Sequence, residues 1–249
     1  MKMKKYVFFF FLAILVINFI ASDNALSKEK SPKKTKQCNI EGLGIFKIGK
    51  TNISIINDLE NELNTKVIVT SNSLELYKLT GMPNHIFQFI PKSESDYQFS
   101  ICPDVKEYVI SVYNIADMKI EKLKLKFYKD VLFSISCDSS KELEEALKLK
   151  YGEPDFSVRT ESVSCLYKYT GNKVTYEDKY YTSSWENGNI KALNTFMVWH
   201  GDKCENMFTR FLNIDDYKTS EIVRKCEDKI RQQHKVTENQ KRVEKLKDF

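Results

Sequence analysis

Lys119 to Asp155 reads KIEKLKLKFYKDVLFSISCDSSKELEEALKLKYGEPD, and it contains signals for two strands, a turn and a helix in succession. Apolar residues alternate with lysines from Leu123 to Phe127, and a second alternating run extends from Val131 to Cys137 beyond a turn at Lys129-Asp130. Alternation places one kind of side chain on each face of a strand. We therefore predict a β-hairpin whose second strand presents Val131, Phe133, Ile135 and Cys137 on one face.

A helix is predicted directly after this hairpin. Asp138, Ser139 and Ser140 offer side-chain oxygens to the free N–H groups of a helix start, and glutamates follow in the first turn. Gly152 and Pro154 then end the helix. The buried stripe is expected to consist of Leu143, Ala146, Leu147 and Tyr151. The stretch is therefore a hairpin with a helix packed on it, and no residue in it is specific to a chemical activity.

Residues 1–27 have the composition of a secretory signal peptide. Three lysines precede an apolar run from Tyr6 to Ile20, and small and polar residues follow. This run of about 15 residues is shorter than the ~20 residues that span a bilayer as a helix, so a retained membrane anchor is the alternative. We expect cleavage after Ser22 or Ser27 and a periplasmic or secreted mature protein, with membrane contact only through an uncleaved signal segment.

Residues 28–37 are expected to form a disordered basic linker, because KEKSPKKTK at 28–36 contains no apolar residue. The formal net charge of the chain is +5, but the residues before Gln37 carry +6 and those from Glu221 onward carry +3, which leaves −4 for Gln37 to Ser220. A mildly acidic globular region lacks the basic surface that nucleic acids bind. We therefore expect no nucleic-acid partner.

The six cysteines all lie beyond the signal region. An even number of cysteines in an exported protein indicates disulfides, although six cysteines allow 15 pairings and the sequence does not choose among them. Reduced cysteines in the core are the alternative. No C-x-x-C motif occurs, so neither a thioredoxin-type redox site nor a close-spaced zinc site is predicted. The candidate disulfide cysteines are Cys38, Cys102, Cys137, Cys165, Cys204 and Cys226.

Gly44 to Thr51 reads GIFKIGKT, which matches the phosphate-binding pattern G-x-x-x-x-G-K-[ST]. Such a loop needs small, turn-forming residues so that successive backbone N–H groups converge on phosphate, whereas its apolar residues here favour a strand. We expect a short strand, a turn at Gly49, and Thr51 or Asn52 as the cap of a helix, with no bound nucleotide. The apolar stripe of that helix would be Ile53, Ile56, Leu59 and Leu63.

Two further groups of strands and a terminal helix are predicted. Five strand-like runs between Val67 and Asp117 predict an antiparallel meander. Four more follow Pro154, with a type I′ turn signal at Asn187-Gly188. Trp185, Phe196 and Val198 are expected to share a face of these strands. A helix is expected from Thr219 onward, and its charged distal part beyond His234 is expected to project or fray.

These elements predict an α+β protein with a mainly antiparallel β-sheet and one or two helices packed on a face. The globular region is expected at 38–216 and a C-terminal helix with a charged distal end at 217–249. The order of strand, turn and helix occurs twice, which raises the hypothesis that 38–117 and 118–216 are related halves sharing one sheet.

No catalytic, cofactor or metal site is predicted. The common hydrolase, nucleotide and calcium motifs do not occur, and the carboxylates are placed on helix faces and in turns, where they do not identify a glycosidase pair. His200 and Cys204 have a spacing that could chelate zinc, with Cys226 and His234 as further ligands if the terminal helix docks against that loop. A disulfide at Cys204 is the favoured interpretation.

Aromatic residues are dense between positions 167 and 185, where Tyr181 also lies. Exposed together, such rings make a face that binds sugar or protein, because flat groups stack on ligands and lose little rotamer entropy. Core packing and cross-strand pairing are the alternative. The candidate binding face consists of Tyr167, Tyr169, Tyr176, Tyr180 and Trp185.

Three short segments resemble exported proteins of low-GC Gram-negative bacteria whose activity is uncharacterised, namely Lys150 to Pro154, Trp185 to Asn189 and Leu246 to Phe249. Ile48 to Thr51, followed by a helix, is similar to the strand-to-helix entry of small periplasmic proteins associated with outer-membrane assembly. The resemblance implies a location in the cell envelope and a binding role with an envelope or secreted protein as partner, and it supplies no catalytic residues.

The sequence therefore predicts a non-enzymatic exported binding or structural protein. The alternative is an exported hydrolase whose site is built from dispersed residues. A buried His200 or a pocket with converging carboxylates would favour the hydrolase, whereas an exposed aromatic face of the sheet would favour binding.

Overall fold

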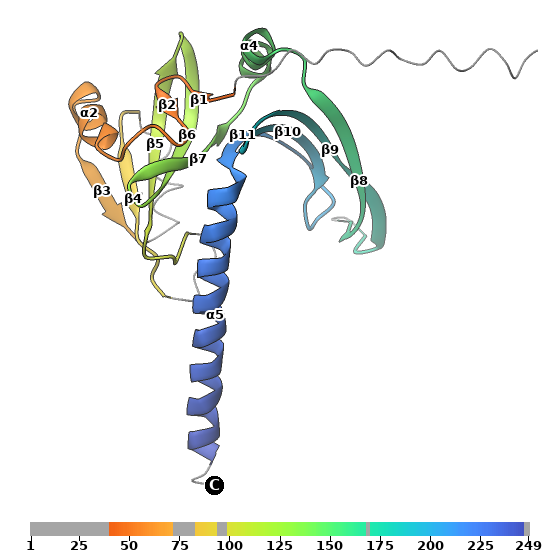
Figure 1. Ribbon diagram of the computed structural model, residues 1–249. Coiled ribbons are helices and arrows are strands. Elements are labelled where there is room, and N and C mark those ends of the chain that lie inside the picture. The colour runs from red at the N-terminus through yellow and green to blue at the C-terminus, as the bar shows by residue number, and fades with distance from the viewer. Residues whose placement is uncertain (1–39, 72–82, 94–98, 168–169, 247–249) are drawn as a thin grey trace, which may run out of the picture. The chain divides into compact units, whose positions relative to one another are not determined.

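The computed structural model describes residues 40–71, 83–93, 99–167 and 170–246. The strands of its main sheet are β3 (Val67–Thr70), β4 (Ile86–Phe89), β5 (Val105–Ile115), β6 (Met118–Tyr128), β7 (Val131–Asp138), β8 (Asp155–Leu166), β9 (Lys173–Asn187), β10 (Ile190–His200) and β11 (Asn206–Asp216). They form one nine-stranded sheet in the order β3-β4-β5-β6-β7-β11-β10-β9-β8 (Figure 1). The C-terminal strand β11 therefore lies in the middle of the sheet, beside β7.

Three helices and a small hairpin complete the described structure. The helices are α2 (Ile55–Glu62), α4 (Lys141–Tyr151) and α5 (Tyr217–Leu246), and the hairpin is formed by β1 (Gly42–Leu43) and β2 (Phe46–Lys47). All strand pairs of the main sheet are antiparallel except β3 with β4. The predicted α+β class, the mainly antiparallel sheet and the C-terminal helix are confirmed.

The hairpin and helix at 119–155 form as their local signals indicate. β6 and β7 pair as an antiparallel hairpin, and the hydroxyl of Ser140 caps α4 by accepting a hydrogen bond of 3.1 Å from the N–H of Leu143. Gly152 ends the helix with a φ of 85°, a conformation that glycine adopts without strain. Local signals therefore specify the turn, the helix start and the helix end in this part of the fold.

The predicted alternation along β7 is wrong at its start. The register between β6 and β7 shifts at Lys126 and Phe127, so that Leu132, not Val131, lies opposite Phe127. Leu132 shares a core cluster with Ile135 and Cys137, whereas Phe133 packs in the separate cluster of Val223, and Val131 is exposed. The extra residue of a β-bulge reverses the faces to which the following side chains point, and strict alternation does not anticipate it.

The largest core cluster joins α2, α4 and one face of the sheet. Helix α2 contributes Ile56 and Leu59, and α4 contributes Leu143, Leu147 and Tyr151. The sheet residues of the cluster come from strands β6, β7, β9, β10 and β11, among others, and include Leu125, Phe127, Ile135, Trp185, Ala192, Leu212 and Ile214. Helix α5 packs elsewhere, because its Val223 belongs to a separate cluster with Phe133 and Cys102.

Gly42 fixes the position of the β1-β2 hairpin against α4. Its carbonyl oxygen accepts a hydrogen bond of 2.6 Å from the buried hydroxyl of Tyr151. A Cβ atom at this position would lie 1.9 Å from the carbonyl oxygen of Phe46, and the φ of 147° is one that glycine tolerates. Only glycine fits here.

The meander predicted between Val67 and Asp117 is only partly correct. Strands β4 and β5 occur where strand-like runs were expected, but β3 pairs with β4 in the parallel direction, and Phe99 to Cys102 form no strand. Two of the expected runs fall wholly or partly within 72–82 and 94–98, outside the described residues. Pairing direction depends on where distant segments dock, so it is not written in the local pattern.

Two disulfides are present. Cys102 is bonded to Cys226 and Cys165 to Cys204, with Cα atoms 5.7 and 5.3 Å apart. The prediction that Cys137 forms a disulfide is wrong, because its thiol is free and buried in the core of the sheet. Cys38 lies outside the described residues.

The remaining predictions on domain organisation concern the chain ends and the two halves. The signal peptide at 1–27 and the linker at 28–37 lie outside the described residues. Helix α5 begins two residues earlier than Thr219, and its distal apolar residues Val236, Val243 and Leu246 are exposed. The hypothesis of two related halves is not confirmed.

Candidate functional site

The predicted aromatic residues do not lie on a single face. Tyr176 and Tyr180 occupy positions of the same parity on β9, whereas Trp185 has the opposite parity and therefore points to the other face. Tyr167 is exposed just beyond the end of β8. Tyr169 lies outside the described residues. The set named from the sequence is thus divided between the two sides of the sheet.

Trp185 belongs to the core. Its side chain is only 2% exposed, and its indole N–H donates a hydrogen bond of 2.8 Å to the carbonyl oxygen of Gly152. This bond satisfies a backbone group at the end of α4, which the helix itself cannot pair. A side chain buried in this way stabilises the junction of α4 and β9 and is not available to a ligand.

Tyr180 contacts two charged residues of β8. Its hydroxyl donates a hydrogen bond of 3.1 Å to the carboxylate of Glu161, and the guanidinium carbon of Arg159 lies 4.4 Å from the centre of its ring. Arg159 also forms an ion pair of 3.2 Å with Glu161. These three side chains form an exposed polar cluster beside the edge of the sheet, because β8 is the last strand.

Tyr176 lies against His200, the histidine whose burial would favour a hydrolase. The ring of His200 stacks on that of Tyr176, with centroids 4.2 Å apart, and its Nδ1 lies 2.9 Å from Oδ1 of Asp178. The same carboxylate oxygen accepts a hydrogen bond from the backbone N–H of His200. The side chains of His200 and Asp178 are 10% and 7% exposed. Because an ionised carboxylate only accepts, Nδ1 is the donor in this contact.

A second aromatic set lies on the opposite face of β9, in one row across four strands. Val158, Tyr181, Phe196 and Arg210 are register partners on β8, β9, β10 and β11, so their side chains share a face. The rings of Tyr181 and Phe196 stack with centroids 5.9 Å apart, and Phe208 continues the stack at 6.5 Å from Phe196. We call Phe156, Val158, Tyr181, Phe196 and Phe208 the β8–β11 patch.

The β8–β11 patch is open to solvent. Phe156, Val158 and Phe208 are 63%, 52% and 65% exposed, and Tyr181 and Phe196 are half-buried. Single exposed apolar residues are ordinary, but a contiguous group of large ones marks an interaction surface. The patch is therefore the strongest candidate functional surface in the described part of the chain.

The length of α4 explains why this face is uncovered. An 11-residue helix extends about 16 Å, whereas the 15-residue strand β9 extends about 50 Å. Helix α4 covers the end of the strands near Trp185 and Leu212, which share its core cluster. The strands continue past the helix, and the β8–β11 patch occupies that uncovered part.

Arg210 lies at the boundary between α4 and the patch. Its guanidinium carbon is 4.7 Å from the centre of the Phe196 ring, and its Nη1 forms an ion pair of 2.5 Å with Glu144 of α4. Glu144 also accepts a hydrogen bond from Ser183 of β9. Burial acts to raise the pKa of Glu144, but Lys148, Ser183 and Arg210 outweigh it and hold that pKa below its usual value. The guanidinium group of Arg210, which lies over the ring of Phe196, is thus held in place by Glu144 of α4.

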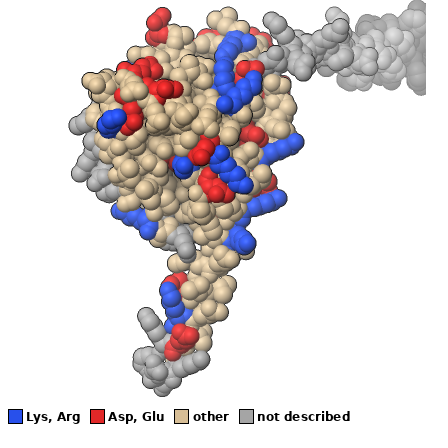
Figure 2. Space-filling view, turned by 60° about the vertical axis from the view of Figure 1, so that its left-hand side comes forward, with Lys and Arg blue, Asp and Glu red and all other residues tan. Residues whose placement is uncertain are grey.

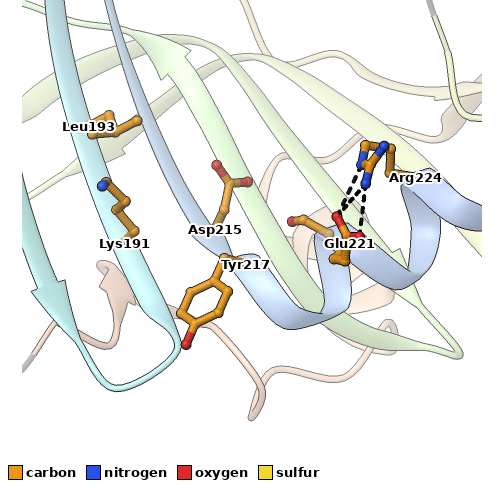
Figure 3. A pocket seen from close by; sticks show the side chains of 7 residues that line it. Lys191, Leu193, Asp215, Tyr217, Glu221 and Arg224 are labelled. Carbon is orange, nitrogen blue, oxygen red and sulfur yellow. Dashed lines mark hydrogen bonds and ion pairs between the residues drawn. The ribbon is translucent and has the colours of Figure 1, made fainter.

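A shallow cavity of about 320 Å³ lies between the sheet and the start of α5 (Figure 3). Asp215 and Lys191 line it from the sheet, Tyr217 stands at its rim, and Arg224 is held by Glu221 on the helix (Figure 3). Burial raises the pKa of Asp215, against the opposing effects of Ser134 and Lys126. The charged groups of this cavity are of both signs, and it contains no histidine, cysteine or serine paired with a base.

Many charged residues elsewhere form ion pairs, among them Lys106 with Asp130 and Lys122 with Asp138. Lys, Arg, Asp and Glu side chains are interspersed on the face that Figure 2 shows. The one carboxylate buried among lysines, Glu107, lies 3.1 Å from Lys126 and 3.7 Å from Lys124 and accepts a hydrogen bond from the backbone of Ser100. Burial lowers the pKa of Lys124. Glu107 therefore joins β5 to the lysines of β6 and to the backbone of Ser100.

The segment that matches the phosphate-binding pattern folds as a hairpin. Phe46 and Ile48 are buried, and the N–H groups of residues 48–51 donate to the carbonyl oxygens of Glu41, Leu132 and Lys47. The hydroxyl of Thr51 accepts from the N–H of Lys47. Helix α2 begins only at Ile55, with Ser54 at its N-cap, so neither Thr51 nor Asn52 caps it as predicted. These N–H groups are used within the protein and do not converge on a phosphate.

The zinc alternative is excluded by the disulfides. Cys204 and Cys226 are bonded to Cys165 and Cys102, so neither has a thiolate to offer a metal. Among the described residues, no three of the side chains that bind metals best come together.

No protein-family model matches this chain, and neither the curated proteins nor the solved structures contain a significant match. Within the described ranges, no helix has both the length and the apolar character needed to cross a bilayer.

Sequence reasoning missed most of the β8–β11 patch. Tyr181 was recognised as part of the aromatic set, and the expectation that Trp185, Phe196 and Val198 share a face agrees with the register of β9 and β10. Phe156, Val158 and Phe208 were not considered. The available signal was the mismatch in length between a short helix and long strands, which leaves apolar positions without cover.

Proposed function

We propose that this chain is an exported, non-enzymatic binding protein that contacts a protein partner through the β8–β11 patch. The observation that carries the proposal is the exposed, in-register stack of Tyr181, Phe196 and Phe208, bordered by the fixed guanidinium of Arg210. Aromatic residues and arginine are the side chains that contribute most to protein–protein affinity. The order of the stack also reduces the rotamer entropy lost on binding.

A protein suits this surface better than a sugar. Sugar recognition requires both donors and acceptors beside the rings to bind hydroxyls, whereas Arg210 already pairs with Glu144, and the exposed Lys179, which lies opposite Val198 on the same face, supplies donors only. The cavity at the start of α5 is lined by other residues. An apolar surface of matching shape on a partner protein would bury the rings.

The proposed location is the periplasm or the outside of the cell. Two disulfides in one chain are typical of an oxidising compartment. The signal peptide expected at 1–27 is the second support for this location, and its cleavage site lies at Ser22 or Ser27. The resemblance to exported envelope proteins supports the same location.

The patch is tested by capture with matched variants. Wild type, Phe208→Ser and Leu149→Ser are immobilised and exposed to an envelope extract under non-reducing conditions. Leu149 is 90% exposed on α4, so its substitution is an equal change of an exposed apolar residue outside the patch. We expect a partner protein to be captured by both wild type and Leu149→Ser. The amount captured should fall at least tenfold with Phe208→Ser. Identical retention by all three proteins would contradict the proposal.

The alternative is an exported hydrolase, and one observation favours it. His200 is largely buried and hydrogen-bonded to Asp178, which is the arrangement of a base and its orienting carboxylate. Its ring contacts Asp178 and Tyr176, and neither is a serine, threonine or cysteine that could act as a nucleophile. Turnover on a panel of esters or glycosides, lost in His200→Gln, would establish this function in place of the binding one.

A further inference from the structure

The outer edge of the sheet at β8 is long, and it is covered at one end, where the N–H of Leu166 donates to the carbonyl oxygen of Asp202. β8 is the terminal strand of the sheet (Figure 1), and it pairs with β9 over 12 residues without a register shift. It contains no proline and no lysine, the residues with which proteins usually block pairing at an edge. Eight of its positions from Asp155 to Ser162 are exposed in succession. Such an edge is a template for an additional strand.

The hydrogen bonds at the end of β8 reveal which backbone groups face outward. The N–H of Tyr167 donates to the carbonyl oxygen of Asn172, on the side of β9, whereas that of Leu166 donates to Asp202 instead. In an antiparallel ladder, residues alternate between those bonded to the neighbour and those directed away from it. The even-numbered residues from Phe156 to Ser164 therefore direct their N–H and C=O groups away from β9.

The charges of β8 select one register for pairing with a second copy of itself. With a two-fold axis at Thr160, Thr160 lies opposite the partner's Thr160. The residues of both copies whose N–H and C=O groups point away from β9 then face one another. In this register Arg159 lies opposite Glu161 of the partner subunit, and the same pair forms again across the axis. Shifting the axis by one residue would place two arginines or two glutamates opposite each other, which is unfavourable.

We propose that two copies of this chain associate through β8, antiparallel and centred on Thr160, to form one continuous sheet. Backbone hydrogen bonds and a Thr160 pair hold the centre, and the two Arg159–Glu161 pairs fix the register. The proposal does not depend on the role of the β8–β11 patch, but it places Phe156 and Val158 of both copies on the same face beside the axis. The dimer would thus present two patches to a partner.

Disulfide trapping tests the geometry directly. Paired Cα atoms at a hydrogen-bonded site of an antiparallel ladder are about 5.5 Å apart, which a disulfide can span. Position 164 would be about 27 Å from its counterpart, since the two lie eight positions apart along the ladder. We expect Thr160→Cys to give a covalent dimer on a non-reducing gel, and Ser164→Cys and wild type to remain monomeric on the same gel.

Charge reversal tests the register. Arg159→Glu places two acidic pairs across the axis, and Glu161→Arg places two basic pairs there, so each should raise the dimer dissociation constant roughly tenfold. The double variant R159E/E161R restores opposite charges at both positions and should restore the dimer. The constants are measured on the processed protein by sedimentation equilibrium, with far-UV circular dichroism to verify that each variant is folded.

Three results would overturn the proposal. One is a wild-type protein that remains monomeric at the highest soluble concentration. Another is equal trapping of Thr160→Cys and Ser164→Cys, which would indicate random collision. The third is a dimer unaffected by either single reversal, which would place the contact elsewhere. If β8 instead pairs with a strand of another protein, the purified chain would be monomeric, which is the first of these results.

Discussion

At the scale of single residues, Cys137 differs from the other described cysteines because it remains a thiol. It lies opposite Leu212 in the sheet and is buried in the largest core cluster. Burial, assisted by the nearby carboxylate of Asp138, raises its pKa to about 12. The thiolate is the reactive form, so the folded protein suppresses the chemistry of this residue.

We therefore expect Cys137 to resist alkylation in the native protein. Treatment with iodoacetamide at about pH 8 should leave the peptide containing Cys137 unmodified, whereas the same treatment in concentrated denaturant without reductant should modify it completely. Peptide mass spectrometry measures both. Modification of Cys137 in the native state at the rate of an exposed thiol would show that this part of the core opens readily.

Trp185 shows what a residue's sequence context leaves undetermined. Tyr180 and Tyr181 lie a few residues before it in the sequence, and Trp185 and Tyr180 are both part of the predicted binding face. The register of β9 places Trp185 and Tyr180 on opposite faces, and the backbone carbonyl of Gly152 provides the indole with its partner. Parity along the strand was visible in the sequence, but the position of α4, which buries one face at that point, was not.

At the scale of elements, helix α4 is attached to the sheet by polar contacts as well as by its apolar stripe. Glu144 reaches Arg210 of β11 and Ser183 of β9, so that one carboxylate joins three elements. Its pKa is held below the usual value of 4.5, which means that folding favours the ionised form. The contribution is therefore complete above about pH 4.5 and is lost as the pH falls through the lowered pKa.

We expect Glu144→Gln to destabilise the protein by about 1 kcal/mol at neutral pH, because the charge-assisted bonds to Arg210 and Ser183 are weakened. The matched control is Glu145→Gln, because Glu145 is exposed and contacts only Lys148 within the helix; it should change stability by less than about 0.5 kcal/mol. Urea unfolding at neutral pH and near pH 4 measures both. The difference between wild type and Glu144→Gln should shrink in acid, and a difference that grows would contradict the assignment.

The elements that were predicted correctly are those whose signals are local. The hairpin and helix at 119–155 depend on alternation, a capping serine and a terminal glycine, and all of these act within a few residues. The bulge opposite Phe127 and the parallel pairing of β3 and β4 depend on contacts between distant segments. Periodicity contains no information about such contacts, so these features were not predicted.

At the scale of the whole molecule, two disulfides connect parts that the sheet alone leaves apart. Cys102–Cys226 joins the start of β5 to α5 and closes 124 residues, while Cys165–Cys204 closes 39 residues at the end of β8. Each pair has one buried and one partly exposed cysteine. The two crosslinks are therefore well matched except for the length of chain that they close.

We expect removal of the longer crosslink to cost more. The loop-entropy relation predicts that C102A/C226A loses about 1 kcal/mol more stability than C165A/C204A. Chemical denaturation of both double variants under non-reducing conditions provides the comparison. Equal losses, or a larger loss for C165A/C204A, would mean that local contacts at the β10-β11 turn outweigh the effect of loop length.

The location of the candidate surface was predictable only in part. The sequence favoured an aromatic face on the strands after Pro154, and the β8–β11 patch lies on those strands. Its members differ from most of the nominated residues. The part of the sheet that α4 leaves uncovered lies on the face opposite Tyr176 and Tyr180. Composition indicated a binding surface, whereas its position required knowledge of how far the helix extends along the sheet.

The position of β11 between β7 and β10 imposes an order on folding. In the proposed export the N-terminal part of the chain enters the oxidising compartment first, so β5, β6 and β7 are present before β11 arrives, and one side of β7 must wait with its backbone groups bonded only to water. The sheet closes when the last strand arrives, and only then does Cys226 follow to meet Cys102. A chain truncated before β11 would consequently retain an unpaired Cys102 and two separate half-sheets, a form that quality-control proteases can distinguish from the finished protein.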